Sequence, residues 1–323
     1  MTLSRKTGEV GHRLFSVLPS ILRPGDLLVV NDTKVLRGRL RAKRKGGGAV
    51  EIFLLSRLDG EGPAGERWEA LARPSKRLSA GEAFGIGGAL AVRLDRRRGE
   101  GRWEVSLFAP GGTVADALER VGEVPLPPYI RRVPGNPAGD EDARRYQTVY
   151  AALPGSVAAP TAGLHFDEDM LRELGAAGIG VARVTLSVGY GTFSPIRTEE
   201  VEEYAIHPEW YRLTPEAAAA VNAARARGGR VVAVGTTSVR TLETCAGEDG
   251  TVAPSEGVTR KFIFPGYRFR AVDALLTNFH LPRSSLLALV MAFAGVEPVR
   301  AAYRAAVGEG YRFYSYGDAM LVA

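Results

Sequence analysis

The chain has 323 residues, of which 45% are hydrophobic and 24% charged, and these values exclude a wholly disordered, collagen-like or coiled-coil protein. At about 150 residues per domain, the length predicts two domains, or one large domain with an insertion. The net charge is +6, with 36 Arg against 6 Lys, and the first 50 residues carry the whole surplus. A concentration of guanidinium groups favours a polyanionic partner, with an arginine-rich solvated face as the alternative.

Cysteine content and hydropathy indicate where the protein works. The single cysteine, Cys245, can form neither an internal disulfide nor a zinc site alone, which predicts a reducing cytoplasm. The longest apolar run, Leu286–Val296, covers 11 residues, about half of the ~20 that cross a bilayer. The N-terminal residues lack the apolar stretch of a signal peptide. We therefore expect a cytoplasmic monomer without a membrane partner.

The first 110 residues change character near residue 39. A short apolar strand, Leu27–Val30, precedes the turn-forming Asn31-Asp32-Thr33, and such continuous strands are usually buried on both faces. Residues 39–110 instead alternate polar and apolar side chains in short stretches that Gly-rich turns separate, namely Ala49–Leu55, Arg67–Ala72, Ala89–Leu94 and Arg102–Leu107. This pattern is typical of a small all-β barrel or sandwich.

The remaining sequence has an α/β pattern. A helix is predicted over Thr113–Val121, and after Tyr150 strands and helices alternate, with polar caps at helix starts and glycines at helix ends. The expected strands are Val181–Val188, Val231–Val234 and Ala271–Leu276, and the expected helices begin near Asp167, Thr214, Ser238 and Ser284. The strand before residue 39 has the same buried character. We therefore predict an α/β fold in which one large, barrel-like α/β domain (residues 1–38 and 111–323) is interrupted by a small all-β barrel insertion (residues 39–110).

Four junctions share one pattern, in which an apolar strand runs into small or hydroxyl-bearing residues and then into a helix or turn. They are Gly235–Ser238 with Arg240 one turn later, Pro160–Phe166, Thr277–Pro282 and Gly189–Phe193. Ligands of open α/β sheets bind at such strand ends, where free backbone N–H groups attract anions. A purely structural reading, as a capped helix start or a tight turn, stays open for each. The last junction lacks the full G-x-G-x-x-G spacing and carries the weakest signal.

Other kinds of site find little support. His207-Pro208-Glu209 offers two potential metal ligands without a third nearby, so no metal site is predicted. No Ser lies in a G-x-S-x-G motif, which argues against a hydrolase triad. The aromatic stretch Tyr311–Asp318 is either an amphipathic edge strand or a stacking surface for a base or a sulfonium cation.

Eight segments become specific when they are taken together: GDLLVVNDT (25–33), PLPPYI (125–130), YQTVYA (146–151), AAPTAGLHF (158–166), VGYGTF (188–193), AVGTTSVRTLE (233–243), LLTNFHLPRSSLLALVMAFAG (275–295) and YRFYSYGDAML (311–321). In this order and spacing, from about Leu3 to Leu321, the chain resembles the S-adenosylmethionine:tRNA ribosyltransferase-isomerase family of queuosine biosynthesis.

The resemblance implies an enzyme that takes a ribosyl group, and not a methyl group, from S-adenosylmethionine. The acceptor would be 7-aminomethyl-7-deazaguanine at the wobble position of tRNA, and the products would be epoxyqueuosine-tRNA, adenine and methionine. S-adenosylmethionine is then a consumed co-substrate, and no cofactor is expected. The family's architecture, an α/β domain with an inserted β-barrel, agrees with the predicted one.

The resemblance and the chemistry together suggest roles for the motif residues. We expect His280 as first choice of general base and His165 as second, with Asp318 orienting or protonating. The side chains expected to bind substrate are Asn31, Asp32, Thr161, Gly163, Phe166, Gly191, Thr236, Thr237, Arg240, Asn278, Phe279 and Tyr316. Among these, Phe166 and Phe279 would face the sulfonium, Asn31 and Asp32 the ribose or the tRNA base, and Thr236, Thr237 and Arg240 the methionine carboxylate. The residues expected to contact the tRNA backbone are Arg39, Arg41, Lys43, Arg44 and Lys45.

The sequence departs from the family pattern at three places. Family members usually carry a leucine- and proline-bearing segment before the match to Ser4–Glu9, so we expect either an upstream start or the loss of part of the site. Ser187 stands where the family commonly has His, and Arg37-Gly38 where it has Pro-Ala. Two other functions remain open, an S-adenosylmethionine-dependent tRNA methyltransferase and a non-catalytic tRNA-binding protein.

Overall fold

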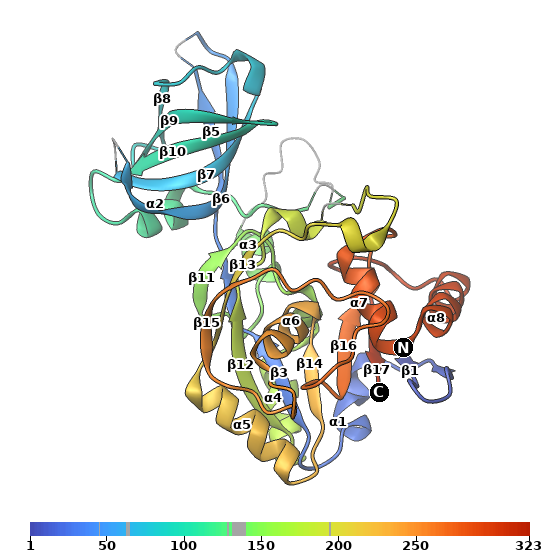
Figure 1. The fold of residues 1–323 in the computed structure, drawn as a ribbon. Coiled ribbons are helices and arrows are strands. Elements are labelled where there is room, and N and C mark those ends of the chain that lie inside the picture. Colours follow the sequence, from blue (N-terminus) through green and yellow to red (C-terminus); the bar gives the residue numbers. More distant parts are fainter. Residues whose placement is uncertain (45, 63–64, 128, 131–139, 194) are drawn as a thin grey trace. The chain divides into compact units, whose positions relative to one another are not determined.

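The computed structural model describes residues 1–323 apart from 45, 63–64, 128, 131–139 and 194. It divides the chain into two compact units (Figure 1). Unit 1 comprises Met1–Lys34, Gln147–Leu153 and Ala159–Ala323, and unit 2 comprises Val35–Tyr146 and Pro154–Ala158. Unit 2 therefore extends beyond the predicted range 39–110 at both ends.

Unit 1 is built on a nine-stranded sheet in the order β15-β13-β12-β3-β14-β16-β17-β1-β2. Its strands are β1 (Thr2–Leu3), β2 (Val10–Gly11), β3 (Leu27–Asn31), β12 (Gly180–Leu186), β13 (Glu209–Leu213), β14 (Val231–Val234), β15 (Ser255–Thr259), β16 (Ala274–Asn278) and β17 (Ala319–Val322). The central strands β12, β3, β14 and β16 run parallel, whereas β13 and β17 pair antiparallel with them. The carboxyl ends of the four parallel strands consequently meet at one edge of the sheet.

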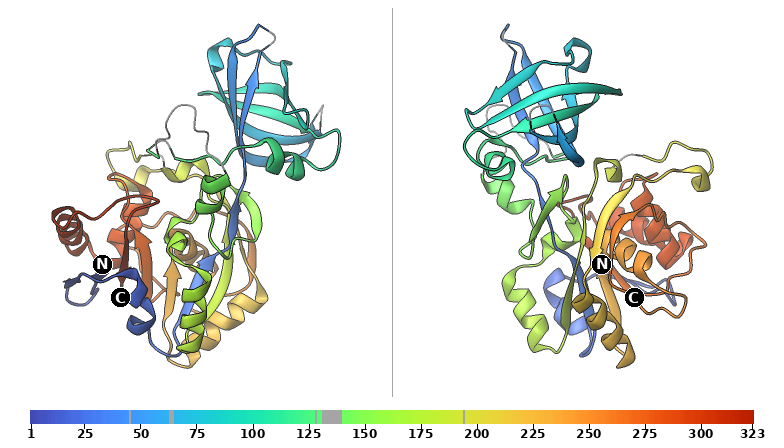
Figure 2. Two further views of the ribbon diagram at one scale, coloured as in Figure 1. Left: turned by 180° about the vertical axis from the view of Figure 1, so that it is seen from behind. Right: turned by 60° about the vertical axis from the view of Figure 1, so that its left-hand side comes forward.

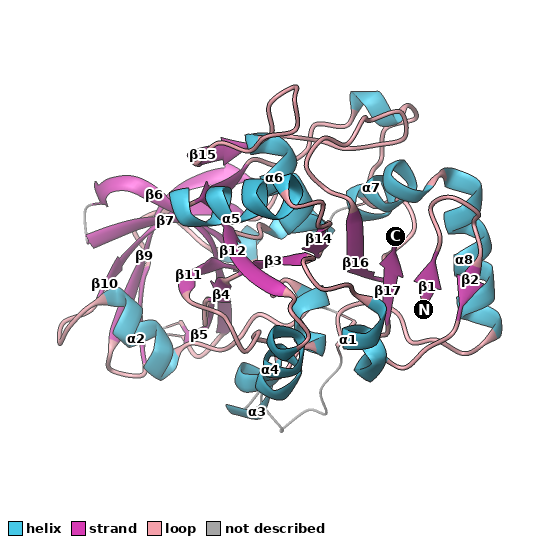
Figure 3. Cartoon of the chain, turned by 90° about the horizontal axis from the view of Figure 1, so that it is seen from below, coloured by secondary structure: helices cyan, strands magenta, loops and turns pink. Residues whose placement is uncertain are grey.

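Helices cover both faces of this sheet (Figures 2 and 3). Helices α5 (Pro215–Ala226) and α6 (Thr236–Cys245) lie on one face, and α1 (Leu18–Ile21) and α4 (Glu168–Ala176) lie on the other. All five residues of β3 are buried, because a parallel strand covered on both faces exposes neither row of side chains to water.

The helices α7 (Ser285–Ala294) and α8 (Val296–Gly308) follow β16 and meet at Gly295. No single helix in the described part of the chain is long and apolar enough to cross a membrane. Only when α7 and α8 are taken together do their length and composition suit a membrane span, and the two helices are bent by 113° at their junction.

The barrel-like closure predicted for the α/β domain is wrong. The sheet ends at β15 on one side and at β2 on the other, and no pairing joins these two strands among the described residues. Antiparallel pairs flank the parallel centre on both sides. Antiparallel neighbours need no crossover helix, so the chain extends the sheet at its two edges instead of closing it.

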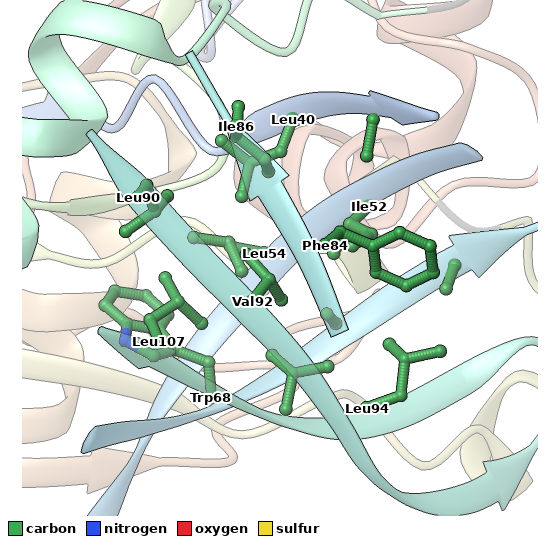
Figure 4. Packing of buried hydrophobic residues seen from close by; sticks show 14 of the residues in the cluster. Leu40, Ile52, Leu54, Trp68, Phe84, Ile86, Leu90, Val92, Leu94 and Leu107 are labelled. Atoms are coloured by element: carbon green, nitrogen blue, oxygen red, sulfur yellow. The ribbon is translucent and has the colours of Figure 1, made fainter. Parts of the chain in front are cut away.

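Unit 2 contains a six-stranded antiparallel sheet in the order β5-β6-β7-β10-β9-β8. Its strands are β5 (Arg39–Lys43), β6 (Ala49–Gly62), β7 (Gly65–Arg73), β8 (Ala83–Ile86), β9 (Leu90–Gly99) and β10 (Arg102–Phe108). The two end strands, β5 and β8, are in contact, so the sheet is nearly closed into a barrel. Its inward side chains form one core, as Figure 4 shows for Leu40, Ile52, Leu54, Trp68, Phe84, Ile86, Leu90, Val92, Leu94 and Leu107.

A helix after the barrel belongs to the same unit. The helix α2 (Val114–Val121) packs Val114, Ala117 and Leu118 into the barrel core, which is why unit 2 continues past residue 110. Unit 2 also holds the short helix α3 (Asp140–Arg145). A separate two-stranded sheet pairs β4 (Thr33–Val35) with β11 (Leu153–Ser156).

Most of the predicted helices and strands are confirmed, and two features differ. Asp167 caps α4 as expected, accepting a hydrogen bond from the Met170 N–H (2.7 Å). The helix α8 was not among the predicted elements because Gly295 and Pro298 resemble breakers, but proline is tolerated in the first turn of a helix. The edge strand considered for Tyr311–Asp318 is wrong, since these residues form a turn and β17 starts only at Ala319.

Candidate functional site

The four predicted junctions come together in unit 1 at the carboxyl ends of the parallel strands. One cavity of about 40 Å³, which we call the strand-end cavity, is lined by residues of all four, with a few neighbours: Ala159, Pro160, Thr161, Ala162, Val188, Thr192, Gly235, Thr236, Thr237, Thr277, Asn278, His280 and Leu286. Its polar groups are mainly hydroxyls, with one amide and one imidazole. This is the edge of an α/β sheet at which ligands generally bind.

A larger cavity of about 290 Å³, the His165 cavity, lies in the same unit. It is lined by Met1, Thr2, Arg13, Leu14, Phe15, Leu18, Ile21, His165, Leu276, Glu309, Gly310, Tyr311, Asp318, Ala319 and Leu321. Two of the three predicted catalytic residues, His165 and Asp318, face this cavity, whereas His280 lines the strand-end cavity. The three side chains therefore do not share one cavity.

Asn278 connects the two cavities. It is the last residue of β16 and is 1% exposed. Its Oδ1 accepts a hydrogen bond from the Thr161 hydroxyl (2.9 Å), and its Nδ2 lies 3.3 Å from Nε2 of His165. An amide that donates through Nδ2 makes Nε2 the acceptor, so a neutral His165 carries its proton on Nδ1. Asn278 thus sets the orientation and tautomer of His165.

His280 lies two residues beyond the end of β16 and is half-buried. Its Nε2 is 2.7 Å from the Thr277 hydroxyl, and its backbone N–H donates to the Tyr303 hydroxyl (2.8 Å). Burial lowers the pKa of His280 to about 4, because the imidazolium ion loses hydration. His280 is therefore neutral at pH 7 and able to accept a proton.

His165 stacks on Phe15, with ring centroids 4.9 Å apart. Burial lowers the pKa of His165, and the Asp318 carboxylate opposes that shift. Asp318 itself accepts a hydrogen bond from the backbone N–H of Arg312 (2.7 Å). Both predicted histidines are thus neutral at pH 7, and Asp318 acts on His165 and not on His280.

The start of α6 carries the two hydroxyls that were predicted to bind an anion. Gly235 has φ +85° and allows the sharp turn from β14 into the helix. Thr236 and Thr237 line the strand-end cavity beside the N-terminal N–H groups of this ten-residue helix. A helix N-terminus favours negative charge.

Arg240, one turn into α6, is held by Glu209. Both side chains are buried, and the Arg240 Nη1 donates to Oε2 of Glu209 while Nε donates to the Lys261 carbonyl (3.0 Å). The charge of the guanidinium is therefore already compensated. Nη2 of Arg240 is buried and finds no partner within the described part of the chain, so it is the donor left for a ligand.

Glu209 is a site residue that the sequence reasoning missed, since it appeared there only as a potential metal ligand. It stands at the first position of β13, and its Oε1 accepts from the Gly189 N–H (2.7 Å) and the Thr192 hydroxyl (2.8 Å). Gly191, a predicted ligand residue, packs on the ring of His207, where a Cβ would come within 1.9 Å of Cδ2. A carboxylate at a buried position of an alternating strand, on the same face as Tyr211 and Leu213, is the signal that could have revealed Glu209.

The prediction that Asn31 binds ribose or base is wrong. Asn31 is 1% exposed, and its Nδ2 donates to the Leu186 carbonyl and the Thr237 hydroxyl, both at 3.0 Å. Its Oδ1 accepts from the N–H groups of Thr33 (3.2 Å) and Leu186 (3.0 Å). These four bonds use the whole capacity of an amide, so Asn31 joins β3 to its neighbours and is not free for a ligand.

The two aromatic rings predicted to face a sulfonium, those of Phe166 and Phe279, are buried outside the lining of both cavities. Phe279 is 0% exposed and packs among other aromatic rings, those of Tyr303, Tyr311 and Phe313. Phe166 is 4% exposed in the core of unit 1, against Phe15 and Tyr150. Neither ring lines the strand-end cavity or the His165 cavity, and a contact of either ring with the sulfonium stays a prediction.

Three other predicted residues lie beside the cavities and not in their walls. Gly163 is buried against the Tyr150 hydroxyl, which a Cβ would approach to 2.1 Å, so its role is close packing. Asp32 accepts a hydrogen bond from the Thr185 hydroxyl (2.6 Å). Tyr316 does not belong to the lining of either cavity.

Four of the residues predicted to contact tRNA, Arg39, Arg41, Lys43 and Arg44, are described and lie on or beside β5 in unit 2, and three of them are paired with carboxylates. Their carboxylate partners are Glu51 for Arg39, Glu123 for Arg41 and Glu82 for Arg44. Lys43 is exposed and has no acidic partner among the described residues, and Lys45 lies outside them. The sequence count therefore overstates the free positive charge of this segment.

The described residues contain no group of three or more His, Cys, Asp or Glu side chains placed to hold a metal ion. Cys245 is buried, and burial raises the pKa of its thiol to about 11. A thiol with this pKa stays protonated and unreactive near neutral pH.

Comparison with known proteins identifies the family. A family model described as "Queuosine biosynthesis protein" matches residues 1–322. The chain belongs to the queuosine biosynthesis protein family. It is 54% identical over 322 residues to an S-adenosylmethionine:tRNA ribosyltransferase-isomerase of Anaeromyxobacter dehalogenans, with 100% of this chain and 91% of the relative covered. The corresponding protein of Moorella thermoacetica is 52% identical over 324 residues, with 100% and 92% covered.

A solved structure from this family has a similar fold. The crystal structure of the S-adenosylmethionine tRNA ribosyltransferase from Thermotoga maritima is 36% identical in sequence and superposes with a TM-score of 0.52. The match covers 100% of this chain and 91% of that one. Queuosine biosynthesis family membership thus extends over the full length of both units.

Proposed function

We propose that this protein is an S-adenosylmethionine:tRNA ribosyltransferase-isomerase. The observation that carries the proposal is the match to relatives of that name at more than 50% identity along the whole chain. The reaction transfers and isomerises the ribosyl moiety of S-adenosylmethionine onto 7-aminomethyl-7-deazaguanine at the tRNA wobble position. It yields epoxyqueuosine-tRNA and releases adenine and methionine. The alternatives, a tRNA methyltransferase and a non-catalytic tRNA-binding protein, are not favoured by any of these matches.

The reacting ribose belongs where the two cavities adjoin. His165 and Asn278 are in hydrogen-bond contact, and each lines a different cavity. The start of α6, with Thr236 and Thr237, offers hydroxyls and N–H groups for the methionine carboxylate, and Arg240 Nη2 adds a buried donor nearby. The strand-end cavity holds only a few water molecules at its present size, so binding of S-adenosylmethionine requires its walls to separate.

The first chemical step needs a neutral base. The positive sulfonium acidifies the C5′–H of the ribose, and a base that removes this proton leaves an ylide whose electrons open the ring and expel adenine. His280 borders the strand-end cavity and is unprotonated at pH 7, and its position supports it as that base even though a pKa of about 4 makes it a weaker base than an ordinary imidazole. The amine of the modified base then attacks, and closure of the epoxide expels methionine.

The same scheme has consequences for cofactors, assembly and location. The sulfonium itself supplies the electrophile, so the reaction uses S-adenosylmethionine as a consumed co-substrate and needs no resident cofactor. Action as a monomer stays a prediction. The tRNA substrate and the single, buried Cys245 support a cytoplasmic location.

The reaction is tested by its small-molecule products. The protein is incubated with S-adenosylmethionine and tRNA that bears 7-aminomethyl-7-deazaguanine, and the products are identified by mass. Adenine and methionine in equal amounts are expected. S-adenosylhomocysteine would indicate a methyltransferase, and unchanged S-adenosylmethionine would indicate a protein that only binds tRNA.

The choice of base is tested by two variants in the same assay. His280→Ala is expected to lower the rate of adenine release by about 10²- to 10⁴-fold, the usual contribution of a general base. His165→Ala is expected to lower it less, because His165 lines the His165 cavity and not the strand-end cavity. A parental rate in His280→Ala, combined with loss of activity in His165→Ala, would reverse this ranking.

A further inference from the structure

We propose that Glu209 is a positioning residue for this reaction, which holds the turn Gly189–Thr192 and the start of α6 in fixed relation around the strand-end cavity. The inference rests on the proposed function, because it assigns Glu209 an effect on how the enzyme uses S-adenosylmethionine.

The strand register brings Glu209 to this place. β13 runs antiparallel to β12, with Leu186 opposite Tyr211, and the Ser187 N–H donates to the Trp210 carbonyl (2.9 Å). The next residue toward the start of β13 is Glu209, so it lies beside the segment that leaves the carboxyl end of β12. Only the antiparallel pairing of these two strands puts its carboxylate next to the Gly189–Thr192 turn.

The two carboxylate oxygens of Glu209 hold two different segments. Oε1 accepts from the backbone N–H of Gly189 (2.7 Å) and from the hydroxyl of Thr192 (2.8 Å). Oε2 accepts from Nη1 of Arg240, which belongs to α6. Glu209 is therefore a bridge between the turn after β12 and the helix after β14.

The bridge adjoins the cavity on both sides. Thr192 lines the strand-end cavity together with His280, and α6 contributes Thr236 and Thr237 to the same wall. Thr192 also borders a smaller cavity of about 10 Å³ that Glu209 and Arg240 line. A shift of the Gly189–Thr192 turn therefore moves a wall of the strand-end cavity.

Burial makes the bridge rigid. Glu209 and Arg240 are 4% and 5% exposed, and an ionised group at such a depth persists only with full hydrogen-bond partners. Buried ion pairs can often be replaced by apolar residues without loss of stability, so stability alone does not call for a carboxylate here. An apolar residue could not accept hydrogen bonds from the Gly189 N–H and the Thr192 hydroxyl. It could also not supply the negative charge that holds the Arg240 guanidinium and so orients its Nη2.

The test compares wild type with Glu209→Gln and Glu209→Asp. Adenine release is measured while S-adenosylmethionine and tRNA are varied separately, and thermal unfolding is followed in parallel. Glu209→Gln retains an acceptor for the turn but loses the negative counter-charge to Arg240, and kcat/KM for S-adenosylmethionine is expected to fall about 10- to 100-fold. The KM for tRNA is expected to stay within about twofold of the parental value. Glu209→Asp keeps the charge and is expected to recover part of the loss.

The matched control is Glu256→Gln on the neighbouring strand β15. Glu256 pairs with Arg212 at the surface (3.5 Å), and both side chains are about half exposed, so this variant is expected to keep the parental kinetic constants. Parental kinetic constants in a folded Glu209→Gln variant would overturn the proposal. So would a loss of activity that affects both substrates alike and matches the fraction of unfolded protein.

A second variant covers the case in which Glu209→Gln does not fold. Thr192→Val removes only the hydroxyl that Glu209 binds, and it is expected to lower kcat/KM for S-adenosylmethionine several-fold without changing the melting temperature by more than a few degrees. Parental kinetics in Thr192→Val would contradict the proposal. Absence of adenine release from the wild-type protein would instead contradict the proposed function, and this inference with it.

Discussion

Single polar side chains in the site owe their properties to burial. His280 and His165 both have a lowered pKa, and in each the largest cause is loss of hydration. Glu209 is more deeply buried than either histidine, and its carboxylate accepts hydrogen bonds from the Gly189 N–H and the Thr192 hydroxyl and pairs with the Arg240 guanidinium. At this scale, removal from water favours the neutral form of both histidines, whereas the hydrogen-bond donors around Glu209 hold its carboxylate in place.

The lowered pKa of His280 predicts a pH dependence of stability. The folded value is about 4 and the unfolded value about 6.5, so between these pH values the unfolded chain binds more protons. The stabilisation is therefore complete above pH 6.5 and is lost as the pH falls toward 4, by on the order of 3 kcal/mol. Replacing His280 with Gln should reduce the loss in free energy of unfolding between pH 6.5 and pH 4 by that amount.

This prediction is checked by urea unfolding of wild type and His280→Gln across pH 4 to 8. Other groups titrate in this range in both proteins, so the difference between the two curves isolates His280. Above pH 7 the two free energies of unfolding should run parallel. If the free energies of unfolding of the two proteins also ran parallel between pH 6.5 and pH 4, His280 would not be shielded from water as described.

At the scale of elements, the site depends on sharp turns at strand ends. β14 passes directly into α6 through Gly235, whose φ is +85°. A Cβ at this position would meet no atom closer than 3.7 Å, so the turn is limited by backbone conformation and not by space. Glycine therefore allows the helix N-terminus to begin next to the cavity.

Gly235→Ala is expected to destabilise the protein by about 1–2 kcal/mol, the cost of a left-handed backbone for a residue with a Cβ. The matched control is Gly175→Ala, since Gly175 lies within α4 and a Cβ there meets open space. That substitution is expected to be stabilising by up to about 1 kcal/mol. Equal effects of the two changes on the free energy of unfolding would contradict this account of Gly235.

At the scale of the whole molecule, charge is distributed unevenly and is partly compensated. The surplus lies in residues 1–50, yet Arg39, Arg41 and Arg44 have carboxylate partners. Contacts with tRNA phosphates must compete with those carboxylates, whereas exposed Lys43 has no such competitor among the described residues. The charge that can act on a nucleic acid is therefore smaller than the net charge suggests.

The affinity for tRNA is expected to fall steeply with salt concentration. Lys43→Gln should weaken binding and lower the slope of log affinity against log salt by about one, and Arg41→Gln should lower it less because Arg41 is paired with Glu123. Lys76→Gln, an equal loss of charge at another exposed position of unit 2, serves as control. Unchanged affinity and slope in Lys43→Gln would remove Lys43 from the proposed tRNA contact.

Much of the fold could be predicted because local pattern determines it. The apolar runs of β3 and β14 and the cap of α4 at Asp167 appear directly in the sequence, since burial and capping depend on neighbouring residues. The open edges of the nine-stranded sheet and the helix α8 could not be predicted in this way. The open sheet depends on pairing between strands far apart in the chain, whereas α8 was missed because Gly295 and Pro298 resemble helix breakers, although proline is tolerated in the first turn of a helix.

By itself, the sequence determined the family, the α/β character of one part, the mainly β character of the other, and the four junctions that line the strand-end cavity. Only the tertiary structure decided which side chains of those junctions border a cavity. Asn31 and Phe279 have suitable chemistry but are saturated or enclosed, and Glu209 becomes important through partners at Gly189 and Arg240. Burial and hydrogen-bond partners arise from residues distant in sequence, and for that reason no local motif could distinguish a ligand-binding side chain from a buried one.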